Sequence, residues 1–278
     1  MPNDQNNYGS VVSLFRYPVK SMMGEELSTT DVTQQGLLGD RMYAVMDSFD
    51  GKVGSAKNPR KWPNLFYFQA SFIEPLHTDI KMSAIQIILP DGTKVSNKQS
   101  DLNHILSKAL QREVTLNSTR HSEEKTTVNA EEYWPDTEDL DYRDTVTDFT
   151  LPEGTFFDCA VVHLLTTATL DRLSELYPQG HFELRRFRPN IIVDSGIGKK
   201  GFIENDWIGQ TLVIGDEVRL SITGSCARCI MTTLPQGDLP KDLGILQTAA
   251  RHNKANVGVY ASVIQGGTIR HGDLVRLE

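Results

Sequence analysis

Two of the three cysteines lie three positions apart beside an arginine, within the segment Gly224-Ser-Cys-Ala-Arg-Cys-Ile-Met-Thr-Thr233. A neighbouring cation favours the thiolate, the form of cysteine that attacks electrophiles and binds metals. Arg228 directly precedes Cys229, so Cys229 is the candidate nucleophile or metal ligand. The competing interpretation is structural, because free cysteine is often a small buried filler. We expect that buried structural role for Cys159.

The spacing of Cys226 and Cys229 also matches a thiol–disulfide pair. Such a pair opens a helix beside a βαβ unit, whereas this one follows the strand-like run Val218-Arg-Leu-Ser-Ile222. A structural zinc site needs four ligands, and the sequence has no second cysteine pair or paired histidines. A disulfide oxidoreductase stays open as an alternative, and it requires Cys226 to matter as much as Cys229.

Basic residues beside turns form a second group with possible chemistry. Lys20-Ser21 follows Tyr17-Pro18, Arg41 follows a Gly-Asp turn, and Arg185, Arg186 and Arg188 precede Pro189-Asn190. Guanidinium groups bind phosphate oxygens in a bidentate fork, and lysine acts as a point charge. Together these residues suit a phosphate-bearing ligand.

Gly196-Ile-Gly-Lys-Lys-Gly201 satisfies the dinucleotide pattern G-x-G-x-x-G. The pattern binds pyrophosphate only where a helix N-terminus follows it. Phe202-Ile-Glu-Asn-Asp-Trp207 has no helical period, so we expect a glycine loop and not a nicotinamide or flavin site.

Composition limits the function classes. The formal net charge of −8 argues against a general nucleic-acid or anionic-membrane binder. No apolar run approaches the roughly 18 residues that a membrane span needs. The N-terminus lacks the layout of a secretory signal, and three cysteines fit a reduced compartment better than a disulfide framework. We therefore expect a cytoplasmic protein.

The elements that must position these residues are mostly short strands. Apolar periodicity predicts only three helices, over about 101–113, from about 170 to Pro178, and over about 240–252. Turn signals separate the strands, with hairpins at Asp50-Gly51 and Asp91-Gly92. This pattern indicates an α+β fold centred on a β-barrel rather than a βαβ sheet. The predicted strands are residues 11–15, 41–46, 85–89, 93–95, 161–165, 190–193 and 257–264. Residues 211–220 and 268–277 are each predicted to form a strand pair.

Two further segments carry structural expectations. Residues 118–150 are strongly acidic and without a clear period, so we interpret them as a solvated connection; the ligand spacing of a calcium loop is absent. Ile214-Gly-Asp-Glu-Val-Arg-Leu220 is echoed by His271-Gly-Asp-Leu-Val-Arg-Leu277, which predicts two similar hairpins in the barrel.

Four motifs in order resemble those of MOSC-domain proteins. They are Arg16-Tyr-Pro-Val-Lys-Ser21, Gly36-Leu-Leu-Gly-Asp-Arg41, Phe187-Arg-Pro-Asn-Ile-Ile192 and Cys226-Ala-Arg-Cys-Ile-Met-Thr-Thr233. The chain is most similar to the two-part form found in amidoxime-reducing components and their bacterial relatives. That resemblance implies an N-terminal β-barrel-like domain over residues 8–122 and a MOSC domain over 123–278, packed together.

The resemblance also implies a cofactor and its site. The family binds the molybdenum cofactor (Mo-molybdopterin), and by position Cys229 is the ligand of the metal and the catalytic residue. The match places the phosphate and pterin at Lys20, Ser21, Arg41, Arg188 and Asn190. Thr166 and Tyr260 match shorter motifs, and Arg228 adds charge beside the thiolate. A cofactor held by both parts of the chain would lie between them.

The resemblance implies a reductase of small N-oxygenated molecules such as hydroxylamines or amidoximes. The sequence lacks an iron–sulfur cysteine run and a flavin site, so electrons must come from another protein, a flavin or iron–sulfur reductase. The alternative is a non-redox carrier of the cofactor or of sulfur, in which Cys229 bears a persulfide.

Overall fold

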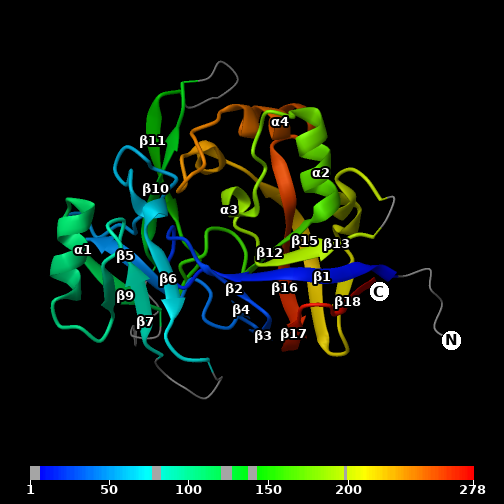
Figure 1. Ribbon diagram of the computed structural model, residues 1–278, viewed down its shortest axis with the longest axis horizontal. Coiled ribbons are helices and arrows are strands. Elements are labelled where there is room, and N and C mark those ends of the chain that lie inside the picture. The colour runs from blue at the N-terminus through cyan, green and yellow to red at the C-terminus, as the bar shows by residue number, and fades with distance from the viewer. Residues whose placement is uncertain (1–6, 77–82, 120–126, 137–142, 197–198) are drawn as a thin grey trace.

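The structure, a computed structural model, describes residues 7–76, 83–119, 127–136, 143–196 and 199–278. Within these ranges short strands dominate and helices are few (Figure 1), which confirms the predicted α+β class. No helix in these ranges is long and apolar enough to cross a membrane.

Seven strands of the described chain close into a β-barrel. Side chains on alternate positions point inward, and those of Val11, Leu14, Val162, Leu220 and Val259 meet in one buried cluster. β1 pairs with both β18 and β13, and the second pairing closes the ring. The order around the barrel is β13 (Ile191–Asp194), β12 (Val162–Thr166), β16 (Asn256–Gln265), β15 (Val218–Ala227), β14 (Thr211–Ile214), β18 (Leu274–Leu277) and β1 (Asn7–Arg16).

The first strands of the chain belong to this C-terminal barrel. β2 (Glu25–Leu27) pairs with β1, while β3 (Thr29–Thr33) pairs with β4 (Gly36–Leu37) and with β17 (Gly267–Arg270). Val32 and Leu37 join the barrel core. The predicted unit of residues 8–122 therefore shares its beginning with the core of the C-terminal part, and the division at residue 122 stays a prediction.

The echoed sequences form only one hairpin. β14 and β15 pair directly, as predicted. The second copy does not, because β18 already has β14 and β1 on its two sides, and β17 pairs with β3 instead. The expected strand pair at residues 268–277 is thus wrong, although both strands exist.

The rest of the N-terminal half has its own core. Leu102 and Leu106 of α1 (Leu102–Leu110) pack there with Val45, Phe68 and Ile87, and the predicted first helix and the Asp91-Gly92 hairpin are confirmed. The strands are β5 (Tyr43–Asp47), β9 (Val114–Ser118), β6 (Gln69–Phe72), β7 (Ile85–Ile88) and β8 (Lys94–Ser96).

The described part of the acidic segment contains a hairpin, which the sequence interpretation did not predict. β10 (Asn129–Trp134) pairs along its length with β11 (Thr145–Thr150). Its carboxylates meet cations of the N-terminal half: Lys52 pairs with Glu131 at 2.9 Å and with Asp148 at 2.7 Å. These ion pairs come from residues far away in sequence, so composition alone did not reveal them.

Helices cover one end of the barrel. Leu173 of α2 (Thr167–Leu176) and Ile245 of α4 (Gly244–Asn253) share a cluster with Phe187 of the short α3 (Leu184–Phe187). The second and third predicted helices are confirmed; α3 was not predicted, since four residues show no period. Short 3-10 helices are η2 (Leu65–Tyr67), η3 (Ile203–Trp207) and η4 (Ile230–Thr233).

The glycine pattern at 196–201 lies partly outside the described residues, which exclude 197 and 198. The element that follows it is the five-residue η3. This short 3-10 helix is not the long helix whose N-terminus a dinucleotide site needs.

Candidate functional site

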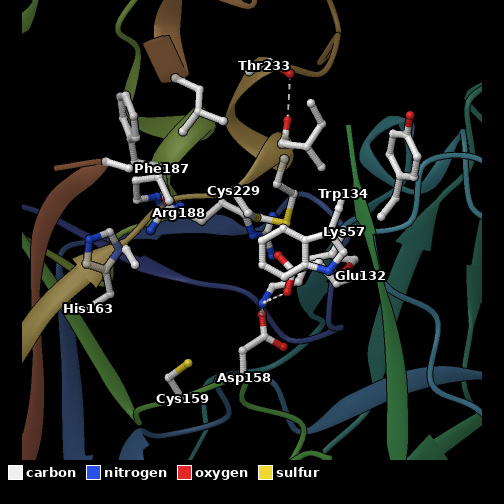
Figure 2. A pocket seen from close by; sticks show the side chains of 18 of the residues that line it. Lys57, Glu132, Trp134, Asp158, Cys159, His163, Phe187, Arg188, Cys229 and Thr233 are labelled. Atoms are coloured by element: carbon white, nitrogen blue, oxygen red, sulfur yellow. Dashed lines mark hydrogen bonds and ion pairs between the residues drawn. The ribbon is translucent and has the colours of Figure 1, made fainter. Parts of the chain in front are cut away.

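A cavity of about 890 Å³ lies between elements of both halves of the chain. Figure 2 shows Cys229 near its middle, with His163 and Arg188 on one side and Lys57, Glu132 and Trp134 on the other. The structure brings almost all the residues predicted from the sequence into its lining: Lys20, Ser21, Arg41, Arg188, Asn190, Arg228, Cys229 and Tyr260.

Thr166 is the predicted site residue that is not part of this lining. It is fully buried, and its hydroxyl caps α2 by accepting a bond from the amide of Thr169. The same hydroxyl donates to Glu204 at 2.7 Å. Thr166 thus begins the helix, as N-cap threonines do.

Asp40 joins the N-terminal motifs to the barrel, and sequence reasoning missed it. One carboxylate oxygen accepts from the amide of Tyr17 at 2.7 Å. The other accepts from Asn190 Nδ2 at 2.9 Å and forms an ion pair with Arg41. The side chain of Asn190 also accepts from the amide of His163 at 3.1 Å. Asn190 therefore positions the cavity wall.

Three of the predicted residues have left-handed backbone. The φ angles are +64° at Ser21, +48° at Arg41 and +55° at Arg188. Non-glycine residues rarely adopt this conformation, which costs on the order of 1 kcal/mol or more and concentrates at functional sites. The fold keeps these strained turns where the three side chains line one cavity.

The guanidinium of Arg188 is a buried cation, and one of its hydrogen-bond donors has no partner among the described residues. Its Nη1 donates to the carbonyl of Met22 at 2.7 Å, and its guanidinium lies 4.1 Å from the ring centre of Tyr17. Nη2 is buried without a partner among the described residues. Burial lowers the pKa of Arg188 to about 10, so it stays charged at neutral pH.

Lys20 already has a partner. It is buried and forms an ion pair with Asp158, and it donates to the carbonyl of Phe156 at 2.9 Å. Lys57 approaches the same carboxylate at 3.5 Å. Burial raises the pKa of Asp158, but the charges of Lys20 and Lys57 outweigh it and hold the pKa below its usual range. Sequence reasoning missed both Asp158 and Lys57.

Arg228 pairs with Cys226, whereas the sequence predicted that its charge would lie beside the Cys229 thiolate. Its Nη1 donates to Cys226 Sγ at 2.7 Å, and its Nη2 donates to the carbonyl of Phe187 at 2.9 Å. Burial raises the pKa of Cys226, but Arg228 and His163 outweigh it and lower the pKa to about 6. The guanidinium Nε is buried without a partner among the described residues.

Cys229 is the N-cap residue directly before the 3-10 helix η4 and lies at intermediate exposure. Burial raises the pKa of its thiol. The charge of Lys57 and a hydrogen bond from the Met231 amide lower the pKa, but by less than burial raises it. Without a bound ligand this cysteine is therefore mainly a thiol, and the neighbouring Lys57 favours the negative charge that a metal-bound sulfur carries.

Cys159 is exposed and lines the same cavity, so the expectation of a buried structural residue is wrong. The preceding residues Phe156 and Phe157 are buried. Cys159 follows them outside the helices and strands. Among the described residues, no group of three or more His, Cys, Asp or Glu side chains could hold a metal ion by itself.

The chain matches two family models in sequence order. Residues 8–134 match the MOSC N-terminal beta barrel domain, and residues 152–276 match the MOSC domain. The closed β-barrel and the sequence motifs agree with this family of proteins. The chain belongs to the MOSC-domain proteins that carry this N-terminal domain.

Curated relatives share most of its length. Mitochondrial amidoxime reducing component 2 of Rattus norvegicus is 25% identical, over 96% of this chain and 82% of the relative. Molybdenum cofactor sulfurase of Bos taurus is 23% identical, over 90% of this chain and 30% of that larger protein. Among solved structures, the YUAD protein from Bacillus subtilis has a TM-score of 0.48 at 11% identity, covering 97% of this chain and 94% of its own.

Proposed function

We propose that this protein binds a molybdenum cofactor in the cavity around Cys229 and reduces small N-oxygenated molecules such as hydroxylamines and amidoximes. The observation that carries the proposal is a pair of unused buried donors, Arg188 Nη2 and Arg228 Nε, in a cavity that also presents the Cys229 thiol. Buried donors without partners are costly, and a phosphate-bearing ligand supplies the missing acceptors.

The residues present fit such a cofactor. Arg188 and Arg228 would bind its anionic groups, since guanidinium forms strong charge-assisted hydrogen bonds to phosphate. Arg41 and Ser21 line the same cavity, while Lys20, paired with Asp158, contributes less net charge. Cys229 would be the protein's ligand to the metal, because a soft thiolate suits a metal already bound by sulfur.

Reduction of an amidoxime consumes two electrons and two protons and releases an amidine and water. The cofactor, when bound, supplies the two-electron redox chemistry. We propose that the electrons come from a separate flavin or iron–sulfur protein. Burial, together with the charge of Cys226, raises the pKa of Tyr260. Its hydroxyl therefore holds a proton at neutral pH, on the cavity wall beside His163.

Sulfur carriage is the second candidate, favoured by the match to the sulfurase. In that case the Cys229 thiolate attacks the terminal sulfur of a persulfide on a donor protein, and the donor's thiolate leaves. A persulfide on Cys229 needs no molybdenum, so the two candidates differ in what the purified protein contains.

The test is elemental analysis of protein purified from a host that makes the cofactor, with Cys229→Ser alongside. The reductase proposal expects near one molybdenum per chain in the wild type, reduced or labile in the variant. Sulfur that a reductant releases, with molybdenum missing even after incubation with free cofactor, would support the carrier and overturn the reductase.

A further inference from the structure

Helix α4 forms part of the opening of the cavity. Leu243, Gln247 and Ala250 line the cavity and are also exposed to solvent. Arg251 and Lys254 follow these residues along the chain and are exposed as well. Positions three and four apart share one face of a helix, so these two cations continue the exposed face that borders the cavity.

The segment around α4 carries positive charge that the described residues do not pair, although the whole chain has a formal net charge of −8. We call the three exposed cations without an ion pair among the described residues the α4 cations: Lys241, Arg251 and Lys254. The carboxylates nearest in sequence have other partners. Asp242 accepts from the amide of Gly244 at 2.8 Å, and Asp238 pairs with Arg185 at 2.6 Å. The α4 cations can therefore meet the carboxylates of another molecule.

Helix stability explains only part of this arrangement. Cations near the last turn of a helix interact favourably with its negative end, which accounts for Arg251 and Lys254. Lys241 precedes α4, at the positive end, and gains nothing from that interaction. The positive charge thus extends past both ends of the helix, as expected of a surface that binds an anionic partner.

An exposed leucine lies between these charges in the chain. Leu243 is the N-cap residue of α4 and is 49% exposed. Protein–protein interfaces commonly bury apolar side chains at their centre and keep polar and charged groups around them. Leu243 together with the α4 cations provides both components of such an interface.

The position of this surface suits the delivery of electrons. The β10–β11 hairpin and α4 lie on the same side of the molecule (Figure 1), and both line the cavity that contains Cys229. On the hairpin side the charges are paired, Asp136 with Arg143 at 2.7 Å and Glu132 with Lys57 at 3.7 Å. A charged protein that approaches this opening is therefore oriented mainly by α4.

We propose that the α4 cations and Leu243 are the docking surface for an acidic one-electron carrier protein. Carboxylates of the carrier meet the three cations, and its apolar residues cover Leu243. Two reduced carriers each lose one electron for every amidoxime reduced, and two protons come from solvent, so that amidine and water complete the balance. The inference rests on the proposed reductase function for its reaction, but the docking step can be measured separately.

The kinetic test uses cofactor-loaded protein, hydroxylamine as substrate and two electron donors. Reduced flavodoxin is an acidic flavin protein, and reduced methyl viologen is a small molecule that needs no docking surface. The variant Lys241→Glu/Arg251→Glu/Lys254→Glu should lose at least about tenfold in kcat/KM for flavodoxin at low salt, because charge steering accelerates association by about that factor or more. Its rate with methyl viologen should match wild type, which also shows that the variant is folded.

The matched control is Lys94→Glu/Lys98→Glu/Lys108→Glu. These lysines are exposed, have no ion pair among the described residues and lie outside the cavity lining. The control variant has the same formal net charge as the α4 variant, so it should keep the wild-type rate with flavodoxin. An equal loss in both variants would reveal an effect of net charge alone and would overturn the docking surface.

Salt and binding supply two further criteria. Raising the ionic strength from about 0.01 M to about 1 M shortens the Debye length from about 30 Å to about 3 Å, and it should remove the difference between wild type and the α4 variant. Titration calorimetry with oxidised flavodoxin measures docking without turnover. Leu243→Ser should weaken that binding about fivefold or more and leave its salt dependence unchanged, because no charge is altered.

The outcomes separate the two proposals. Flavodoxin binding that the α4 variant loses, without reduction of hydroxylamine by either donor, would keep the docking surface and overturn the reductase. Reduction driven by methyl viologen, with flavodoxin binding that is absent in wild type or unchanged in the α4 variant, would keep the reductase and overturn the docking surface.

Discussion

The guanidinium of Arg228 donates a hydrogen bond to Sγ of Cys226 at 2.7 Å and so pairs with the cysteine two positions before it, not with its neighbour Cys229. The cysteine pair is therefore divided between two roles. Cys226 is a fully buried counter-ion that holds the arginine, and Cys229 is the thiol on the cavity wall. This arrangement argues against a disulfide exchange centre.

The thiolate of Cys226 makes folding stability depend on pH. Its pKa is lowered from 9.0 to about 6 in the folded protein. Between these values the unfolded state binds more protons, so this contribution is complete above pH 9 and is lost as the pH falls towards 6. Serine does not titrate there, so the stability of wild type relative to Cys226→Ser should increase from pH 6 to pH 9 in urea unfolding. Parallel curves for the two proteins would contradict the prediction, and Cys159→Ser is the control.

Asp158 forms ion pairs with Lys20 and Lys57, and removing its charge should destabilise the folded protein. Asp158→Asn leaves buried Lys20 without its counter-ion. Loss of one partner of a buried pair costs about 3–5 kcal/mol, and we expect the lower part of this range because Asp158 is partly exposed. Urea unfolding measures the change. Glu175→Gln, which removes surface ion pairs with Arg172 and Lys200, is the control and should have little effect.

Arg188→Lys should weaken cofactor retention while the protein stays folded. A lysine keeps the charge but cannot both donate to the Met22 carbonyl and present a second fixed donor to the ligand. Loss of one charge-assisted hydrogen bond predicts at least about tenfold weaker binding. Molybdenum content after dialysis checks it. Arg185→Lys is the matched control, because Arg185 pairs with Glu183 and Asp238 near the surface; equal losses in both variants would count against the role of Arg188.

Accessibility and ionisation of the cysteines predict different labelling orders, and we expect accessibility to decide. In native protein, iodoacetamide should modify exposed Cys159 first, Cys229 next and buried Cys226 last, although Cys226 has the lowered pKa. Peptide mapping over time measures the order. Modification of Cys226 as fast as Cys159 would show that the arginine pair opens in solution.

Short-range sequence patterns predicted much of the secondary structure. Helical periodicity identified α1, α2 and α4, and turn residues identified the hairpins between β7 and β8 and between β14 and β15. These features depend on neighbours within a few residues, which is why one sequence reveals them. Pairings between distant strands were harder. β17 and β18 look like a hairpin, but the closed barrel gives each of them a distant partner.

The motifs selected residues that line the cavity, but they did not reveal the partners of those residues. Arg41, Arg188 and Asn190 converge as expected, but Asp40, which joins Arg41 to Asn190, was missed because its carboxylate looks like part of an ordinary turn. The acidic hairpin was missed because several of its carboxylates pair with cations more than 70 residues away in the chain, as with Lys52 and Glu131.

The sequence by itself determined the family, the α+β class and the type of each residue around Cys229, since motifs and periods are local in the chain. Only the tertiary structure decided which of these residues touch. It paired Arg228 with Cys226, neutralised Lys20 with Asp158 and placed Cys159 in the cavity. The physical reason is that burial and charge pairing depend on which distant segments the closed barrel brings together, and local sequence carries no record of those distances.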